Sequence, residues 1–350
     1  MRIKALILIS VIRYLPLANS TAKQIQDHVQ DEALKNIAAT ISEVLERSRA
    51  TSTLNKYSTY FRRWLSWASI FNEIREFPAD YKYVALYLTS LVQENKSFAV
   101  IDSTFYAIKH SHVIASEKDP TEHNLTIYIL EAAKRICNRQ VKKKEPITFE
   151  NLLEIYGKIG KTESNLLNLR TFTLMVTSFA AFFRYSEASN LTLGDIMFHD
   201  SFIKVFIEKS KTDQYREGHW VHIAKTSSEI FPVKILERYI KEANITEHNK
   251  FLFRATTYFK NSNVHKLRRG NKTISYSTAR STILELIRSI GLNDKMFGLH
   301  SLRSGGATAA ARNGVPDRLF KNHGRWKSEN VKDGYVRDKL EDILKVSLNL

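Results

Sequence analysis

The sequence predicts a mainly α-helical chain with a small antiparallel β-sheet, divided into a helical domain and a mixed α+β domain. Three observations support this prediction. Apolar residues recur at three- and four-residue spacing through most of the chain, as they do on buried helix faces. The spacing changes to that of strands between residues 201 and 224. A cationic stretch ending at Pro146 separates two segments, each long enough to bury its own core.

The composition indicates a folded protein with an anionic partner. The 350 residues include 53 Lys and Arg against 36 Asp and Glu, a formal net charge of +17, and 43% are hydrophobic. Such a surplus favours a polyanion, with nucleic acid ahead of an anionic membrane. The single cysteine, Cys137, excludes an internal disulfide and a Cys-rich zinc site. No apolar run reaches membrane-spanning length, so no membrane partner is expected.

The first half of the chain is predicted to be helical. Residues 1–34 are expected to form an N-terminal extension without catalytic importance; their apolar run loosely resembles a secretion signal, but it is short and Arg13 interrupts it. Residues 35–140 are predicted to form a helical domain. Its first buried face comprises Tyr57, Phe61, Trp64, Leu65 and Ala68. Pro78 marks a break and a start signal, and helices are expected over 81–93, 98–116 and 123–140.

A basic linker is predicted at residues 141–146. Six cations fall within the eleven residues 134–144, and Pro146 stops any helix. The segment can be a solvated connection or a cationic strap across a phosphate backbone. The candidate DNA-binding residues of such a strap are Arg135, Arg139, Lys142, Lys143 and Lys144.

The second domain is predicted to span residues 147–350. Helices are expected over 149–158, 166–183, 233–243 and 278–290. The segments 201–208 and 219–224 predict a β-hairpin, with Lys209 and Lys211 at the start of its loop. The basic segment 265–272 is expected to be an exposed loop. The pair Gly305-Gly306 is expected to serve close helix packing rather than to form a phosphate-binding loop.

The second domain contains an ordered series of residues whose side chains are typical of catalytic sites. Arg184-x-x-Glu187 follows a buried helix, and Lys211 comes 27 residues after Arg184. His300-x-x-Arg303 lies further on, where one helical turn can place both side chains on one face. Trp326 follows Arg303 by 23 residues, and Tyr335 follows Trp326 by nine.

In order and spacing, these residues resemble the catalytic set of the tyrosine recombinases, the family of the phage integrases and Cre. The resemblance covers the chain from about residue 35 onward and implies a helical core-binding domain, a linker and a catalytic domain. The catalytic residues it implies are Arg184, Lys211, His300, Arg303, Trp326 and Tyr335. The nine-residue interval selects Trp326 over His323, which is expected to be a packing or capping neighbour. The interval from Arg184 favours Lys211 over Lys209.

The residue types fit an attack on a phosphodiester. Attack by an oxygen nucleophile places extra negative charge on the non-bridging oxygens, and Arg184 and Arg303 offer planar forks that match phosphate. His300 can donate to the same oxygens or help to remove the phenolic proton, whereas the indole of Trp326 can only donate. Tyr335 is the expected nucleophile. Lys211 is the expected general acid for the leaving 5′-oxygen.

No metal or other cofactor is expected, because no cluster of carboxylates stands where a two-metal nuclease would need one. Glu187 is expected to hold an Arg or His in place. The apolar stripe Val336, Leu340, Ile343, Leu344 and Leu348 predicts a terminal helix that packs on its own domain or docks into a neighbouring protomer.

The resemblance implies a site-specific recombinase or integrase that acts as a homotetramer on two double-stranded DNA duplexes through a 3′-phosphotyrosyl intermediate, without ATP. Two alternatives remain: a type IB topoisomerase-like enzyme that relaxes DNA, and a non-catalytic DNA-binding protein derived from a mobile element. Residues 324–335 look closest to Cre-type members and to recombinases of eukaryotic mobile elements. That likeness implies a nuclear protein, or a cytoplasmic one if the source is prokaryotic.

Overall fold

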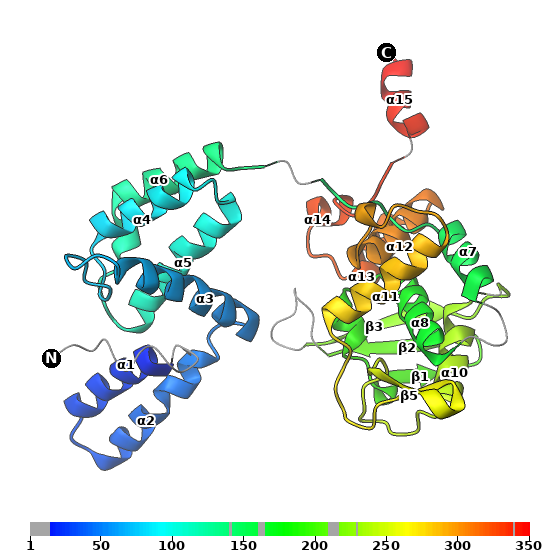
Figure 1. The fold of residues 1–350 in the computed structure, drawn as a ribbon, viewed down its shortest axis with the longest axis horizontal. Helices are drawn as coiled ribbons and strands as arrows, with labels where there is room; N and C mark the ends of the chain where they lie inside the picture. The colour runs from blue at the N-terminus through cyan, green and yellow to red at the C-terminus, as the bar shows by residue number, and fades with distance from the viewer. Residues whose placement is uncertain (1–14, 140–141, 160–164, 209–216, 229, 339) are drawn as a thin grey trace. The chain divides into compact units, whose positions relative to one another are not determined.

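The computed structural model describes the chain except for residues 1–14, 140–141, 160–164, 209–216, 229 and 339. Both Lys209 and Lys211 therefore lie outside the described residues. The chain divides into two compact units, Met1–Val141 and Lys142–Leu350, which Figure 1 colours blue to cyan and green to red. Within the described residues, none of the helices has the length and apolar character needed to span a membrane.

The first unit is helical throughout its described part. Its helices are α1 (Leu15–His28), α2 (Glu32–Glu46), α3 (Thr51–Ala68), α4 (Tyr81–Gln93), α5 (Phe98–Ile114) and α6 (Asn124–Ile136), with a short 3-10 turn at Pro120–Glu122. The stripe expected on α3 buries Phe61, Trp64 and Ala68. Helix α4 begins at Tyr81, as predicted, and is capped by Asp80, whose carboxylate accepts the N–H of Lys82 at 2.8 Å.

The predicted boundary between residues 34 and 35 falls inside α2. Helices α1 and α2 pack against each other, and the hydroxyl of Thr21 on α1 donates to the carbonyl of Ile114 on α5 at 2.8 Å. The described part of the N-terminal segment is therefore continuous with the helical unit.

The second unit contains the helices α7 (Phe149–Ile159), α8 (Leu166–Ala180), α9 (Tyr185–Ser189), α10 (Pro232–Glu242), α11 (Tyr276–Ser289), α12 (His300–Arg312), α13 (Asp317–Gly324), α14 (Glu329–Asp333) and α15 (Leu340–Leu348). Helix α8 buries every residue from Leu169 to Ser178 and runs through the middle of the unit in Figure 1. Helices α7, α10, α11 and α12 all pack on it. The core of the unit is thus built around α8, whose C-terminal end leads directly to Arg184.

The predicted hairpin is confirmed as β2 (Phe202–Ile207) and β3 (His219–Ala224), paired from Phe202↔Ala224 to Ile207↔His219. Strand β1 (Ile196–Phe198) adds a third antiparallel strand, which was not predicted. The prediction that residues 265–272 form a loop is wrong for the first three of them. Residues up to Leu267 belong to β5 (Val264–Leu267), which pairs with β4 (Thr256–Phe259).

Close packing at Gly305 and Gly306 is confirmed. A Cβ on Gly305 would lie 1.9 Å from the carbonyl oxygen of Ile147, and one on Gly306 would lie 2.0 Å from that of Phe179. The extended segment before α7 hydrogen-bonds alongside the start of α12, with the N–H of Ile147 donating to the carbonyl of Ser301 at 3.0 Å. Because neither glycine has a side chain, α12 can approach the backbone of two other segments.

Candidate active site

Arg184 and Glu187 form a local pair at the start of α9. The carboxylate of Glu187 accepts the backbone N–H of Arg184 at 2.9 Å and its Nη1 at 2.7 Å. The first bond satisfies a donor at the helix N-terminus, which explains the three-residue spacing. Phe182, with φ 49°, turns the chain between α8 and α9, and both side chains of the pair are buried.

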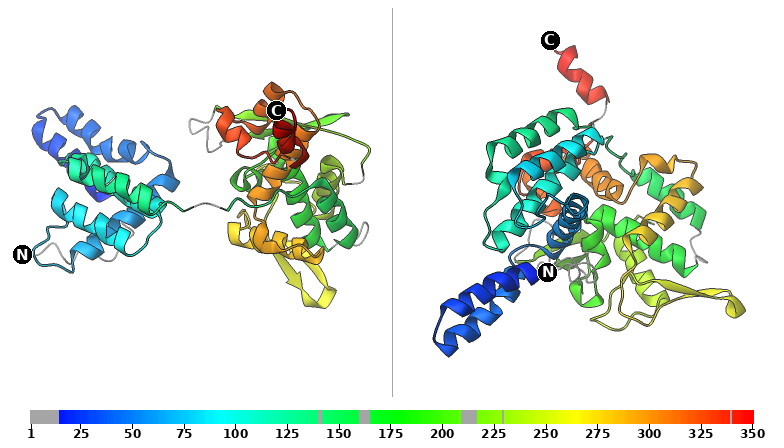
Figure 2. Two further views of the ribbon diagram at one scale, coloured as in Figure 1. Left: turned by 90° about the horizontal axis from the view of Figure 1, so that it is seen from above. Right: turned by 60° about the vertical axis from the view of Figure 1, so that its left-hand side comes forward.

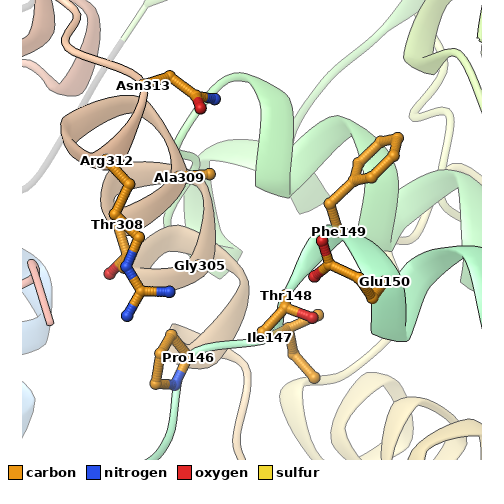
Figure 3. A pocket seen from close by; sticks show the side chains of 10 residues that line it. All are labelled: Pro146, Ile147, Thr148, Phe149, Glu150, Gly305, Thr308, Ala309, Arg312 and Asn313. Carbon is orange, nitrogen blue, oxygen red and sulfur yellow. The ribbon is translucent and has the colours of Figure 1, made fainter. Parts of the chain in front are cut away.

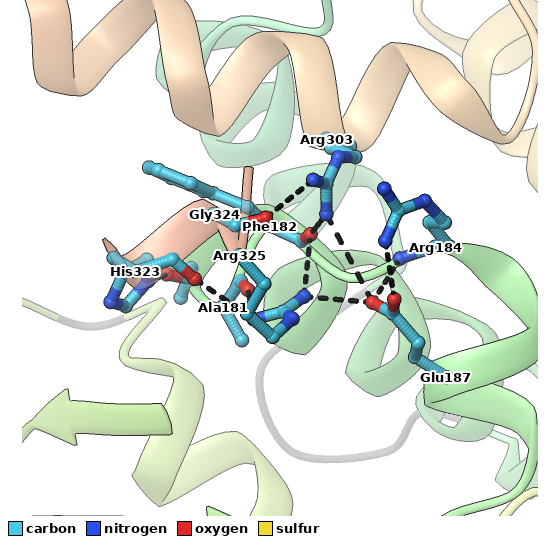
Figure 4. A network of polar contacts seen from close by, with 9 residues as sticks. Ala181, Phe182, Arg184, Glu187, Arg303, His323, Gly324 and Arg325 are labelled. Atoms are coloured by element: carbon cyan, nitrogen blue, oxygen red, sulfur yellow. Dashed lines mark hydrogen bonds and ion pairs between the residues drawn. The ribbon is translucent and has the colours of Figure 1, made fainter. Parts of the chain in front are cut away.

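Two further arginines converge on the same carboxylate (Figure 4). Nη2 of Arg325 donates to Oε2 of Glu187 at 2.7 Å, and Nη1 of Arg303 lies 3.9 Å from that oxygen. Arg303 comes from α12 and is fully buried; Arg325 directly follows α13. Arg184, Arg303 and Arg325 around Glu187 are called the arginine cluster below. One carboxylate faces three guanidinium groups, which leaves a surplus of positive charge.

Burial and mutual interaction shift the pKa values within the arginine cluster. Burial raises the pKa of Glu187, but the attraction of Arg325, the bond from the Arg184 N–H and the charges of Arg184 and Arg303 outweigh it, so that this pKa lies below its ordinary value. Burial, and then repulsion from Arg184 and Arg325, lowers the pKa of Arg303 to about 9. Both groups are therefore charged at neutral pH.

Trp326 and Tyr335 form an aromatic wall against Arg303. The Cζ atom of Arg303 lies 4.6 Å from the ring centroid of Trp326 and 4.9 Å from that of Tyr335, and the two rings are 5.5 Å apart. The carbonyl of Tyr335 accepts the hydroxyl of Ser304 at 2.6 Å, which ties the tyrosine to the helix that carries Arg303. A Cβ on Gly324 would lie 1.9 Å from the indole of Trp326, so glycine is required there.

Several buried donors at this site have no acceptor among the described residues: Nε1 of Trp326, Nε of Arg303 and Nε of Arg325. Leaving a buried donor without a partner costs about 1–3 kcal/mol. Orphaned donors beside a surplus of positive charge fit an anion with several oxygen acceptors.

The other predicted site residues lie as follows. His300 is the first residue of α12 and is exposed, one turn before Arg303. Nε2 of His323 bonds the carbonyl of Ala180 at 2.8 Å, and its ring packs on Phe182. Burial, partly offset by this bond and reinforced by Arg325, lowers the pKa of His323. These contacts match the packing and capping neighbour that the sequence predicted.

The described end of the hairpin that carries Lys211 lies within electrostatic reach of this site. Strand β3 begins at His219, and burial together with the charge of Arg325 lowers the pKa of His219. Gly218, with φ +75°, lies against the ring of Phe206 with no room for a Cβ. The charge of Arg325 thus reaches the start of β3.

The predicted DNA-binding cations are exposed in both units. In the first unit, Arg135 is exposed and Nη2 of Arg139 donates to the carbonyl of Asn95 at 3.0 Å. In the second unit Lys142, Lys143 and Lys144 are exposed. Nζ of Lys143 lies 3.4 Å from the carbonyl of Gly334, the residue before Tyr335.

Arg325 completes the arginine cluster and was not among the predicted site residues. Its donors reach the carbonyls of Ala181, Phe182 and His323 as well as Glu187. It takes the left-handed conformation, with φ 57°, which turns the chain between Gly324 and Trp326. Its position directly before Trp326 was the only signal in the sequence.

A pocket of about 380 Å³ lies on another face of α12 (Figure 3). It is lined by Pro146, Ile147, Thr148, Phe149, Glu150, Gly305, Thr308, Ala309, Arg312 and Asn313. The chain just after Tyr335 is fixed at its rim, because Oγ1 of Thr308 accepts the N–H of Arg337 and Nη2 of Arg312 donates to the carbonyl of Arg337, both at 3.1 Å. In the part of the chain that is described, no group of three or more His, Cys, Asp or Glu side chains could hold a metal ion.

The chain is similar to several known proteins in sequence or in fold. The model of the phage integrase family matches residues 145–341. An integrase/recombinase xerD homolog of Selenomonas ruminantium is 26% identical over 296 residues, which is 83% of each protein. The fold is similar to that of the XerH site-specific recombinase bound to difH substrate, with a TM-score of 0.61, 15% identity, and coverage of 96% of this chain and 94% of that one. It is also similar to that of a lambda integrase dimer bound to a core site, with a TM-score of 0.52, 14% identity, and coverage of 92% and 77%.

Proposed function

The chain belongs to the phage integrase family of tyrosine recombinases, and we propose that it is a site-specific DNA recombinase that cleaves and rejoins DNA through a 3′-phosphotyrosyl intermediate. One observation carries this proposal: Arg303 of the arginine cluster, whose Nε is an orphaned donor, lies against the ring of Tyr335. A phosphodiester placed there would meet guanidinium forks and an indole N–H next to a phenol.

The proposed step transfers the phosphate of the DNA backbone from the 5′-oxygen to the phenolic oxygen of Tyr335. The phenolic oxygen of Tyr335 attacks phosphorus, forming an O–P bond, and the bond from phosphorus to the 5′-oxygen breaks. Arg184, Arg303 and Trp326 stabilise the charge on the non-bridging oxygens. His300 donates to the same oxygens or takes the phenolic proton. Lys211 supplies a proton to the leaving 5′-oxygen, and attack by a 5′-hydroxyl of a partner duplex reverses the step.

We further propose that the enzyme works as a homotetramer on two duplexes. Helix α15 supports this assembly, because none of its residues is buried and Leu340, Ile343, Leu344 and Leu348 are all exposed. An apolar stripe exposed in this way favours docking on a second copy of the chain. The pocket beside α12 is the acceptor we propose for it, since its lining includes Pro146, Ile147 and Phe149.

The proposal is tested with nicked suicide duplexes that carry candidate sites. Wild-type protein is expected to form a covalent protein–DNA adduct, and Tyr335→Phe is expected to form none while keeping its fold. Tyr128→Phe, at a tyrosine that is 70% exposed in the other unit, is the matched control and should behave as wild type. An adduct of equal yield in Tyr335→Phe would place the nucleophile elsewhere.

The products distinguish the alternatives. Recombinant product supports the recombinase, relaxation of supercoiled DNA without exchange supports a topoisomerase-like enzyme, and binding without an adduct on any duplex supports a non-catalytic protein. Origin in a mobile element and residence in the nucleus, or in the cytoplasm of a prokaryote, stay predictions from residues 324–335.

A further inference from the structure

The second unit carries another cationic element, outside the arginine cluster. Strands β4 and β5 and the loop after them, residues 256–272, are called the basic hairpin here. The segment contains five Lys or Arg residues and no Asp or Glu. The five are exposed, and none forms an ion pair with any residue that the structure describes: Lys260, Lys266, Arg268, Arg269 and Lys272.

The hairpin differs from the neighbouring surface in containing no acidic residue. The surface formed by α10, α11 and the adjoining loops mixes both signs of charge, as solvated protein surfaces ordinarily do. Its ion pairs are Lys225–Glu237, Arg238–Glu242, Lys250–Glu247 and Arg288–Asp294. A cationic segment without acids, next to a surface of balanced charge, is suited to an anionic partner.

The hairpin is anchored on the core of the unit. A two-stranded hairpin alone is only marginally stable in water. Here the N–H of Arg268 donates to the carbonyl of Ala255 at 2.8 Å, and Nη1 of Arg254 lies 3.4 Å from the carbonyl of Arg268. Buried Arg170 on α8 donates in turn to the carbonyl of Arg254 at 3.0 Å. The five cations are therefore presented on an element tied to the central helix.

One face of the hairpin is exposed along its whole length. The register places Thr257 opposite Lys266 and Phe259 opposite Val264, and all four residues are exposed. On the other face, Leu267 packs against the core of the unit. Nζ of Lys266 lies 5.7 Å from the ring centroid of Phe259, so the exposed face combines charge with apolar surface. A two-stranded ribbon fits the major groove of B-DNA, where its cations would lie near the backbone phosphates.

We propose that the basic hairpin binds the phosphate backbone of duplex DNA outside the segment held at the arginine cluster. This inference rests on the proposed function, which supplies duplex DNA as the partner. The views in Figures 1 and 2 place β4 and β5, drawn in yellow, on the side of the unit away from α13 and α14. The bound DNA is either the flank of the cleaved duplex or a second duplex.

The test compares two variants of the full chain that have the same reduction in positive charge. The first neutralises the basic hairpin: Lys260→Gln, Lys266→Gln, Arg268→Gln, Arg269→Gln and Lys272→Gln. The second is the charge-matched control on other surfaces of the same unit: Lys158→Gln, Lys234→Gln, Lys241→Gln, Lys250→Gln and Arg288→Gln. Dissociation constants are measured at several salt concentrations for three DNA ligands. The first is a short nicked duplex, and the second is the same duplex with long flanks. The third is a second, labelled duplex added to the complex of the protein with the short duplex.

The hairpin variant is expected to bind the long duplex or the second duplex at least about tenfold more weakly than wild type at 0.1 M salt. The slope of log K against log salt should fall in magnitude by about 0.9 for each phosphate that the variant no longer neutralises, and hence by about 4 to 5 at most. Weaker binding of the long duplex identifies the flank as the partner of the basic hairpin. Weaker binding of the second labelled duplex identifies a second duplex as the partner. Equal behaviour of both variants on both duplexes would overturn the proposal.

The covalent adduct separates this inference from the proposed function. Wild type and both variants should form the Tyr335 adduct equally on the short duplex, because the basic hairpin lies outside the arginine cluster. If wild type forms no adduct, the proposed function fails, and the binding comparison still decides whether the hairpin contacts DNA.

Discussion

At the residue scale, Glu187 holds the three arginines of the arginine cluster together. It is the only carboxylate that the described contacts place among Arg184, Arg303 and Arg325. Arg184 precedes α9, Arg303 lies on α12 and Arg325 follows α13, so one side chain joins three elements. Removing one partner of a buried ion pair leaves an uncompensated charge and is strongly destabilising. The positive site for a phosphate therefore depends on a negative residue that need not touch DNA.

Glu187→Gln is expected to lower the free energy of unfolding by about 3–5 kcal/mol at pH 7. Because the folded-state pKa of Glu187 lies below its ordinary value of 4.5, the carboxylate stabilises the fold fully above pH 4.5. This contribution disappears as the pH falls through the folded-state pKa. The difference between wild type and Glu187→Gln should therefore shrink on acidification, as measured by urea unfolding between pH 7 and 3.

Glu154→Gln, at an exposed position on α7, is the control for this measurement and should stay within about 0.5 kcal/mol of wild type at pH 7. A difference between wild type and Glu187→Gln that does not change with pH would show that the charge of Glu187 contributes nothing to the fold.

Residue spacing predicted part of this site because some of its contacts are local. Arg184 and Glu187 are one helical turn apart. The interval of nine residues to Tyr335 selects Trp326 rather than His323. Arg325 escaped prediction because its burial depends on a left-handed turn and on carbonyls more than a hundred residues away in the chain. No local pattern encodes such contacts.

Helix α12 shows at the element scale how close packing positions the site. Its two central glycines let it contact the backbone of the segment before α7 and of the end of α8. The same helix carries Arg303 and, through Ser304, holds the carbonyl of Tyr335. A shift of α12 would therefore move an arginine and the predicted nucleophile together.

Gly305→Ala is expected to destabilise the protein by about 1–3 kcal/mol or more, because its Cβ would overlap the carbonyl oxygen of Ile147. Gly157→Ala is the matched control on α7, where a Cβ meets no atom within 4 Å. There alanine should stabilise the helix by about 0.5–1 kcal/mol. Thermal and urea unfolding measure both changes, and similar effects of the two substitutions would contradict the packing argument.

Elements with a strong apolar period were predicted well, and weakly patterned ones were not. Helix α4 and strand β3 have the predicted bounds. Helix α8 ends at Ala180, short of the predicted Phe183, because the chain turns at Phe182. The hairpin of β4 and β5 was missed because it is mostly exposed and cationic, so no alternation of buried and exposed residues marks its strands.

On the scale of the whole molecule, the basic stretch separates two units whose cores are independent. The cluster around Trp64 and Leu88 belongs to the first unit, and that around Phe172 and Phe253 to the second. Lys142, Lys143 and Lys144 belong to the second unit, and Ile147 is buried in its core. The predicted DNA-binding cations therefore lie on both sides of this division, with Arg135 and Arg139 in the first unit.

Helix α15 is expected to mediate assembly rather than to stabilise its own chain. Ile343→Glu with Leu344→Glu is expected to leave the melting temperature unchanged within about 1 °C, because neither side chain is buried in its own chain. The same variant should no longer form the tetramer on DNA, because charges on the apolar stripe oppose docking. Sedimentation with duplex DNA measures the change in assembly.

Ser347→Glu with Asn349→Glu adds the same charge to exposed polar positions at the end of the chain and should assemble normally. If Ile343→Glu with Leu344→Glu instead lowered the melting temperature and kept the tetramer, α15 would pack on its own unit and the assembly would need another contact. Because the control adds equal charge, the comparison separates the effect of the apolar stripe from that of net charge.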